Sequence, residues 1–245
     1  MTRLKGIDLN RFTFDMDVTW NAFFTDDNFN VYSRYGGRDG GEPEERMSIA
    51  SLLRTMDEVL AEHARPDGTR RFQPRRPGRQ TPEDIPLLKA NHRGCVRCHI
   101  AREYQLLQSY HDKTFSRREL FRFPLPETLG VTIRQEHGHQ VERVEPKSAA
   151  AVAGVRPGDV ITSVGDVPVH SDYDIRFGLD RSAEPALAGR PIAWTLRRLA
   201  GDGEILTLKV ALKPAPGWWA YDIGWKISLR SAPFRTGMRG YSLAP

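Results

Sequence analysis

The sequence has only two cysteines and no long apolar run in its 245 residues. A transmembrane helix needs roughly 18 consecutive apolar residues, and no stretch of the chain reaches that length. Residues 1–6 contain no apolar region of the kind found in signal peptides. The chain also lacks a strong charge imbalance, because 36 Lys and Arg against 31 Asp and Glu leave a net charge of only +5. Such a small excess does not by itself indicate a nucleic-acid partner.

The composition is that of a globular protein. Hydrophobic residues make up 39% and charged residues 27% of the chain, which is too apolar for a wholly disordered protein and too polar for one with several membrane spans. Hydrophobic cores usually serve domains of roughly 100–150 residues, so this length predicts two domains rather than one.

The first 64 residues have the pattern of a β-hairpin followed by a helix. Residues 17–24 and 31–35 are rich in β-branched and aromatic side chains, and Asp26-Asp27-Asn28 between them is typical of a turn. Ser48 can cap a helix whose apolar residues recur at helical spacing, which predicts one buried apolar face. These apolar residues are Ile49, Leu52, Leu53, Met56, Val59 and Leu60.

Strand, turn, strand, the glycine pair Gly36-Gly37 and helix, in this order, resemble the second half of a thioredoxin fold. The resemblance implies a partial thioredoxin-like module over residues 1–64, where the redox cysteine pair and the cis-proline of a thioredoxin have no match. Half of such a sheet would leave an open edge and an uncovered face. We therefore expect the natural protein to continue upstream of Met1.

Residues 65–86 combine prolines and arginines without any apolar period, which predicts a linker or long surface loop. Arginines at this density can meet phosphate, the carboxylates of a protein partner or the propionates of a cofactor. A solvated basic loop is the simplest interpretation. No aromatic platform or nucleic-acid module accompanies the arginines, so we expect no nucleic-acid partner.

Both cysteines fall in one motif, Cys95-Val96-Arg97-Cys98-His99. Cys-x-x-Cys-His is the attachment signature of a c-type haem. Two thiols one helical turn apart add to the two vinyl groups on one edge of the porphyrin, and the adjoining imidazole reaches the iron from one face. We therefore expect one covalent haem c in residues 87–120, with Cys95 and Cys98 as anchors and His99 as an axial ligand of the iron.

Two other kinds of site remain open for these cysteines. A structural zinc site needs four protein ligands, and His92 and His111 are the candidates to join the two thiols. A redox-active dithiol resembling that of thioredoxins would be expected to follow a buried strand, whereas a short helix-like segment, residues 85–92, precedes this pair.

The motif leaves the second axial ligand of the iron open. Apolar and aromatic residues recur three or four apart from Ile100 to His111 and predict a helix that begins near His99. His111 would lie roughly 18 Å along that helix from His99, which is too far for a straight helix to supply both axial ligands. His63, at the end of the first predicted helix, is a candidate distal ligand. A five-coordinate iron, open to small ligands or peroxide chemistry, is the alternative.

From residue 121 the pattern changes to short strands around one long helix. Leu129-Gly130-Val131 precedes a stretch rich in valine and alanine over residues 141–161, and residues 171–181 are helix-like. Residues 192–212 alternate as a hairpin about Gly201-Asp202-Gly203. Together these features resemble a PDZ domain over residues 121–214.

The resemblance implies a peptide-binding site. In PDZ domains a loop offers backbone N–H groups to a C-terminal carboxylate, and the peptide adds as a strand between the sheet edge and the long helix. The loop residues that this implies are Thr128, Leu129, Gly130 and Val131, and the groove-helix residues are Asp172, Ile175, Arg176 and Leu179.

The alternative is that the chain fills its own groove. The extension over residues 215–245 could do so, or could cover the haem edge, with its aromatic residues Trp218, Trp219, Tyr221 and Trp225. More simply, this extension packs on the two domains.

The sequence thus predicts an α+β protein with a partial thioredoxin-like hairpin-plus-helix module, a helical monohaem segment and a PDZ-like β-barrel domain. The combination resembles bacterial envelope proteins that place a single haem beside a peptide-binding module. Because c-type haem is attached outside the cytoplasm, the resemblance implies a periplasmic cytochrome-like electron-transfer protein without a membrane span. Its PDZ domain would bind a protein partner or C-terminal peptide, including a redox partner.

A haem-free PDZ adaptor with a structural thioredoxin-like part is the alternative function. Protease activity is not expected, because nothing matches the Ser, His and Asp elements of the trypsin-like enzymes that carry PDZ domains.

Overall fold

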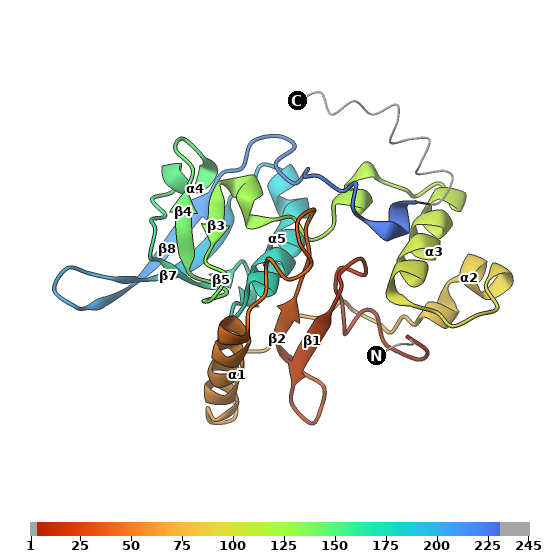
Figure 1. The fold of residues 1–245 in the computed structure, drawn as a ribbon, viewed down its shortest axis with the longest axis horizontal. Helices are drawn as coiled ribbons and strands as arrows, with labels where there is room; N and C mark the ends of the chain where they lie inside the picture. The colour runs from red at the N-terminus through yellow and green to blue at the C-terminus, as the bar shows by residue number, and fades with distance from the viewer. Residues whose placement is uncertain (1–3, 231–245) are drawn as a thin grey trace. The chain divides into compact units, whose positions relative to one another are not determined.

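The computed structural model describes residues 4–230, which fold as two compact units that each combine separate stretches of chain (Figure 1). The helical unit comprises residues 4–18, 75–122 and 222–230, and the sheet unit comprises residues 19–74 and 123–221. These boundaries differ from the predicted ones. The predicted module over residues 1–64 divides after Val18, and the predicted linker over residues 65–86 divides after Pro74.

The helical unit is held together by bonds between its first and last stretches. The Lys226 ammonium lies 2.9 Å from an Asp15 carboxylate oxygen, and both side chains are buried. Asp17 accepts hydrogen bonds from the backbone N–H and the hydroxyl of Ser228, at 2.8 and 2.5 Å. The elements of this unit are η1 (Pro82–Asp84), α2 (Pro86–Asn91), α3 (Cys98–His111), η2 (Arg117–Phe121) and η4 (Ile227–Leu229).

The sheet unit begins with the predicted hairpin and helix. Strand β1 (Asn21–Thr25) pairs antiparallel with β2 (Val31–Gly36), and α1 (Ile49–His63) follows. Strand β1 begins four residues later than predicted, because Asp17 is bound in the helical unit. Ser48 caps α1 as expected, and Ser51 completes the capping box from its own side chain. These three elements are confirmed, whereas their membership of a thioredoxin fold stays a prediction.

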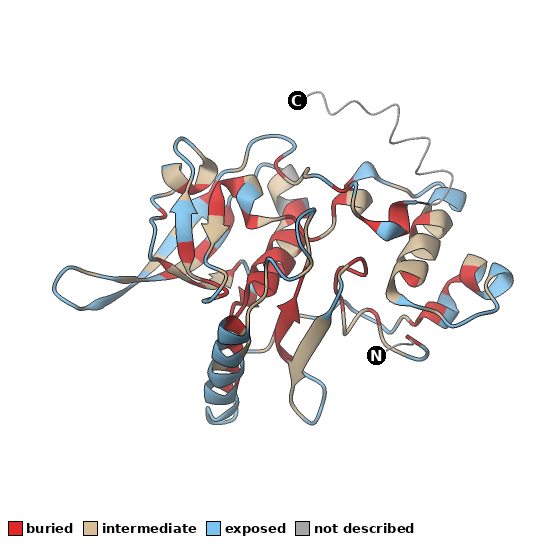
Figure 2. Cartoon of the chain, in the orientation of Figure 1, coloured by how far each residue is buried: buried red, intermediate tan, exposed pale blue. Residues whose placement is uncertain are grey.

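The predicted buried face of α1 is wrong. The exposed fractions of its apolar side chains are 74% for Ile49, 54% for Leu53 and 63% for Leu60, and Met56 is exposed as well (Figure 2). The buried residues of the helix are Ser51, Thr55, Val59 and Glu62.

The polar face of α1 is buried because each polar group on it has a specific partner. The Thr55 hydroxyl bonds to the carbonyls of Ser51 and His170, both at 2.9 Å. Glu62 accepts a hydrogen bond of 2.6 Å from the backbone N–H of Arg71. Small hydroxyl side chains also allow the helix to approach its neighbours closely, so polar complementarity decides which face turns inward.

The rest of the sheet unit forms two small sheets around one long helix. Strands β3 and β4 pair with each other, and the second sheet has the order β6-β5-β7-β8. The remaining elements are η3 (Pro126–Leu129), β3 (Val131–Ile133), β4 (Val141–Val144), α4 (Ala149–Val152), β5 (Val160–Val164), β6 (Val167–Pro168), α5 (Asp172–Leu187), β7 (Ile192–Leu199) and β8 (Ile205–Leu212). Their inward side chains, including Ile161, Trp194 and Leu196, form one hydrophobic core.

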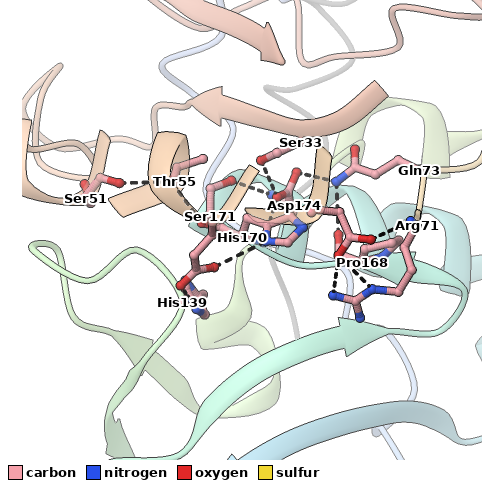
Figure 3. A network of polar contacts seen from close by, with 12 residues as sticks. Ser33, Ser51, Thr55, Arg71, Gln73, His139, Pro168, His170, Ser171 and Asp174 are labelled. Atoms are coloured by element: carbon pink, nitrogen blue, oxygen red, sulfur yellow. Dashed lines mark hydrogen bonds and ion pairs between the residues drawn. The ribbon is translucent and has the colours of Figure 1, made fainter. Parts of the chain in front are cut away.

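Helix α5 is buried all round its first turns, because the sheets cover one side and the hairpin covers another (Figure 2). The Asp174 carboxylate, which is fully buried, joins these layers. It accepts hydrogen bonds from the Ser33 hydroxyl at 2.7 Å, the Arg34 N–H at 2.8 Å and the His170 N–H at 2.9 Å (Figure 3). The Gln73 side-chain amide adds a fourth at 2.5 Å. The hairpin is therefore part of the same packed unit as α5.

Segments predicted as a linker and an extension are packed rather than loose. Gln73 is buried and its N–H donates to the Val31 carbonyl at 2.7 Å, so the chain following the first helix lies against the hairpin. Trp218 belongs to the core of the sheet unit, and Trp219 packs against that core. Trp218 and Trp219 thus pack on a domain, as the simplest expectation had it, whereas residues 231–245 of the extension lie outside the described part.

Candidate functional site

The Cys-x-x-Cys-His motif lies at the start of α3 in the helical unit. Cys98 is the first residue of the helix and His99 the second, as the spacing predicted, while Cys95 lies in the preceding loop. Both cysteines are unpaired thiols; Cys95 is exposed and Cys98 is half-buried. Burial raises the pKa of the Cys98 thiol, which disfavours the thiolate that a redox-active dithiol needs.

A cavity of about 870 Å³ lies along α3 on a neighbouring face. Its walls are mainly apolar and aromatic, and they come from α2, α3 and the chain that follows α3. The lining residues are Leu87, Asn91, Tyr104, Leu107, Tyr110, His111, Lys113 and Phe115. Cys95, Cys98 and His99 are not among them, so the motif itself lies outside this cavity.

The other histidines proposed as ligands have their own environments. The His63 Nδ1 lies 2.8 Å from the Tyr32 hydroxyl in the sheet unit, so one of its ring nitrogens is already hydrogen-bonded. The His111 Nδ1 lies 3.0 Å from an Asp112 carboxylate oxygen. Over residues 4–230, no three or more His, Cys, Asp or Glu side chains gather as they would around a metal ion, so the four zinc-ligand candidates are not brought together.

The predicted carboxylate loop of the second site is well ordered in the sheet unit. Thr128 and Leu129 end η3, Gly130 follows in the left-handed conformation at φ 83°, and Val131 begins β3. Leu129 and Val131 are buried in the core. A Cβ at Gly130 would lie 2.2 Å from the Ser148 Cβ, so glycine is required for packing as well as for the turn.

The four predicted groove residues lie along α5, but all are buried. Ile175 and Leu179 belong to the hydrophobic core of the unit. Arg176 donates to the carbonyls of Arg38 and Phe123, at 3.1 and 3.3 Å. Of the four predicted groove residues, Ile175 and Leu179 therefore pack into the core, while Asp172 and Arg176 contact another part of the chain.

The chain on this side of α5 is residues 37–48, which we call the groove segment. It connects β2 to α1 and contacts Asp172 and Arg176, both predicted for the peptide. If the protein fills its own groove, the sequence offers residues 215–245 as a segment that could do so. Among the described residues the occupant is instead the groove segment, which lies upstream.

Two buried histidines that the sequence does not single out lie against α1, His139 just before β4 and His170 just after β6. The Glu58 carboxylate lies 3.3 Å from the His139 Nε2 and 3.3 Å from the His170 Nδ1 (Figure 3). Although burial alone would raise it, these two hydrogen bonds lower the pKa of Glu58 well below its usual range. Glu58 follows Ser51 and Thr55 at helical spacing, and this polar repeat was the available signal.

Comparison with known families identifies the class of the second site. Residues 140–186 match the family model of the PDZ domain, a stretch that runs from β4 through α5. The chain therefore contains a PDZ domain, completed in the structure by β3, β7 and β8. A search of curated proteins found no match to the chain. PDZ domains bind peptides or protein partners, which is the activity this part of the chain indicates.

Proposed function

We propose that this chain is a monohaem c-type electron-transfer protein whose PDZ domain binds a protein or peptide partner. Cys95 and Cys98 would hold the haem through thioether bonds, and His99 would ligate its iron. The observation that carries the proposal is the motif itself, with two unpaired thiols at the start of a helix and an imidazole that makes no hydrogen bond among the described residues. The bound haem would supply one-electron chemistry.

The donor set fits such a group on two counts. Thioether attachment uses both thiols and does not need a thiol of low pKa, whereas a redox-active dithiol does. The raised pKa of Cys98 therefore agrees better with thioether attachment. The cavity beside α3 has mainly apolar walls and lies in the same unit as the motif, as a hydrophobic cofactor requires.

The cellular location follows from the attachment chemistry, since c-type haem is attached outside the cytoplasm. We propose a periplasmic protein on this ground alone. Among residues 4–230, no helix combines the length and apolar character required to cross a bilayer.

The test is to express the full chain in a bacterial host with an active c-type maturation system. A pyridine haemochrome spectrum and the intact mass should show one covalent haem per chain. Cys95→Ala with Cys98→Ala should abolish the adduct, whereas His111→Ala, which changes a histidine outside the motif, should keep it.

Chain recovered without haem, or with stoichiometric zinc, would overturn the haem proposal. The haem-free adaptor would then be the better account, because the PDZ match stands independently of the motif.

A further inference from the structure

The groove segment covers the helix side of the PDZ groove with backbone contacts at three places. Arg176 donates from Nη1 to the Arg38 carbonyl at 3.1 Å. The Gln135 side-chain amide donates to the carbonyls of Glu44 and Met47, at 3.0 and 2.8 Å. The segment is thus held at both ends of its path, by α5 on one side and by the turn after β3 on the other.

The side chain that the segment inserts is Arg46. Its guanidinium lies 2.9 Å from a Glu127 carboxylate oxygen, 3.4 Å from Asp172 and 2.6 Å from Asp39. Asp39 belongs to the segment itself, but Glu127 precedes the carboxylate loop and Asp172 begins α5. Two carboxylates of the PDZ domain therefore converge on one arginine.

These carboxylates require a cation. Asp172 is buried, and its second oxygen, Oδ2, has no hydrogen-bond partner among the described residues. Burial raises the pKa of Glu127 even with Arg46 beside it. Removing Arg46 would leave the buried Asp172 as an uncompensated charge, whereas Glu127, whose side chain is 38% exposed, would keep part of its hydration. A planar guanidinium can bond two carboxylates at once, which a lysine ammonium does less well.

The strand side of the groove is still open. Over residues 4–230, β3 pairs with β4 alone, and the groove segment contains no strand that could add to its other edge. A cavity of about 300 Å³ is lined by residues of β3, of the groove segment and of the chain around them. Its walls include Thr132, Ile133, Gln135, Glu127, Arg46 and Asp172. A peptide that adds to β3 would therefore find the strand edge available and the helix side taken.

We propose that Glu127 and Asp172 form an arginine-binding site in the PDZ groove, which Arg46 occupies within the same chain. The external partner that this groove fits is a peptide segment with an arginine at that place, and it binds by displacing the groove segment. This inference rests on the partner-binding role proposed for the PDZ domain, and it is independent of the haem.

The test uses the full chain carrying Arg46→Gln, which removes the guanidinium from the site, with Arg54→Gln as the matched control. Arg54 is an exposed arginine on α1, and within residues 4–230 it makes no hydrogen bond or ion pair. The probe is a fluorescent peptide copying residues 37–49, made with arginine, lysine or citrulline at the position of Arg46, and its affinity is measured by anisotropy.

We expect Arg46→Gln to bind the arginine peptide at least tenfold more tightly than the unchanged chain or the Arg54→Gln control does. Citrulline should weaken that binding at least tenfold, and lysine should lie between. Equal binding of the arginine and citrulline peptides, or no binding to Arg46→Gln, would overturn the proposal. Binding of unrelated peptides without arginine would support a PDZ partner role and refute only the arginine site.

Hydrogen exchange decides the question if Arg46→Gln does not fold. Glu127→Gln weakens the site from the PDZ side, so backbone amides of residues 38–48 should exchange at least tenfold faster while those of β7 and β8 do not change. Unchanged exchange in the groove segment would show that the carboxylates do not hold it and would overturn the proposal.

Discussion

The most informative perturbation of the fold is Asp174→Asn, because this carboxylate holds the hairpin against the PDZ helix. Its Oδ1 accepts from the Arg34 N–H and the Gln73 amide, and its Oδ2 accepts from the Ser33 hydroxyl and the His170 N–H. Asparagine keeps the size of the side chain but turns one oxygen into an amide group. That group is a donor and would face two donors.

The expected cost follows from the hydrogen-bond geometry. Each buried donor left without an acceptor costs about 1–3 kcal/mol, so two of them predict a loss of roughly 2–6 kcal/mol. For a unit of this size, this corresponds to a fall in melting temperature of roughly 5–20 °C. The loss of negative charge beside the buried Arg34 guanidinium acts in the same direction, because burial already lowers the pKa of Arg34 to about 10.

Urea unfolding followed by tryptophan fluorescence measures the loss, and hydrogen exchange of the β2 amides shows where the structure opens. The matched control is Asp166→Asn, whose side chain is 61% exposed and pairs with Arg181 at 2.8 Å. An exposed pair of this kind is worth at most about 1 kcal/mol. If the two variants lost equal stability, or if β2 kept its protection in Asp174→Asn, the assignment of Asp174 as the joint would be refuted.

Three further predictions concern other parts of the chain. Lys226→Met should lower the free energy of unfolding by about 3–5 kcal/mol, because it removes the cation beside the buried Asp15. Adding Asp15→Asn should restore part of this loss in thermal unfolding, and no recovery would contradict the prediction. In urea unfolding, Thr55→Val should lower the free energy of unfolding by about 1–3 kcal/mol, and Met56→Gln, at an exposed position, by less than about 0.5 kcal/mol. A larger loss for Met56→Gln would refute the assigned buried face of α1. Burial, with His139 and Arg54 nearby, lowers the pKa of His137 from 6.5 to about 4. Between these two pH values the His137 ring is therefore neutral in the folded protein and protonated in the unfolded chain. Stability should therefore fall as the pH drops from about 6.5 to 4, by less than about 1.4 kcal/mol per pH unit because the ring is partly exposed, and His137→Gln should flatten that slope in unfolding curves.

Features with local causes were predictable from the sequence. Ser48 caps α1 through a bond to a residue three positions away, and Cys98 begins α3 as the motif spacing indicates. The PDZ domain was recognisable because its turns and strands follow one another in a fixed order over fewer than a hundred residues. In each case neighbours in the sequence determine the structure.

Features with distant causes were not predictable. The polar face of α1 is buried because Thr55 meets the His170 carbonyl, 115 residues away. The unit boundary near residue 18 depends on Asp17 and Ser228, which are 211 residues apart. Arg46 lies in a segment without periodicity, and its partner Asp172 is 126 residues downstream. The polar repeat of α1 marks a helix face but not its distant partners, and no motif near Asp17 or Arg46 marks theirs, so only the folded chain brings these residues together.

The bond between the two ends of the helical unit has a consequence for the order of folding during synthesis. Asp15 and Asp17 leave the ribosome 211 residues before Lys226 and Ser228 do. The sheet unit, which ends at residue 221, can complete its packing first. The segment with Cys95 and Cys98 must then wait, since closure over so long a loop is among the slower steps of folding. Cys98, which is half-buried in the folded unit, therefore stays more open to modification until these residues arrive, whereas Cys95 is exposed in either case.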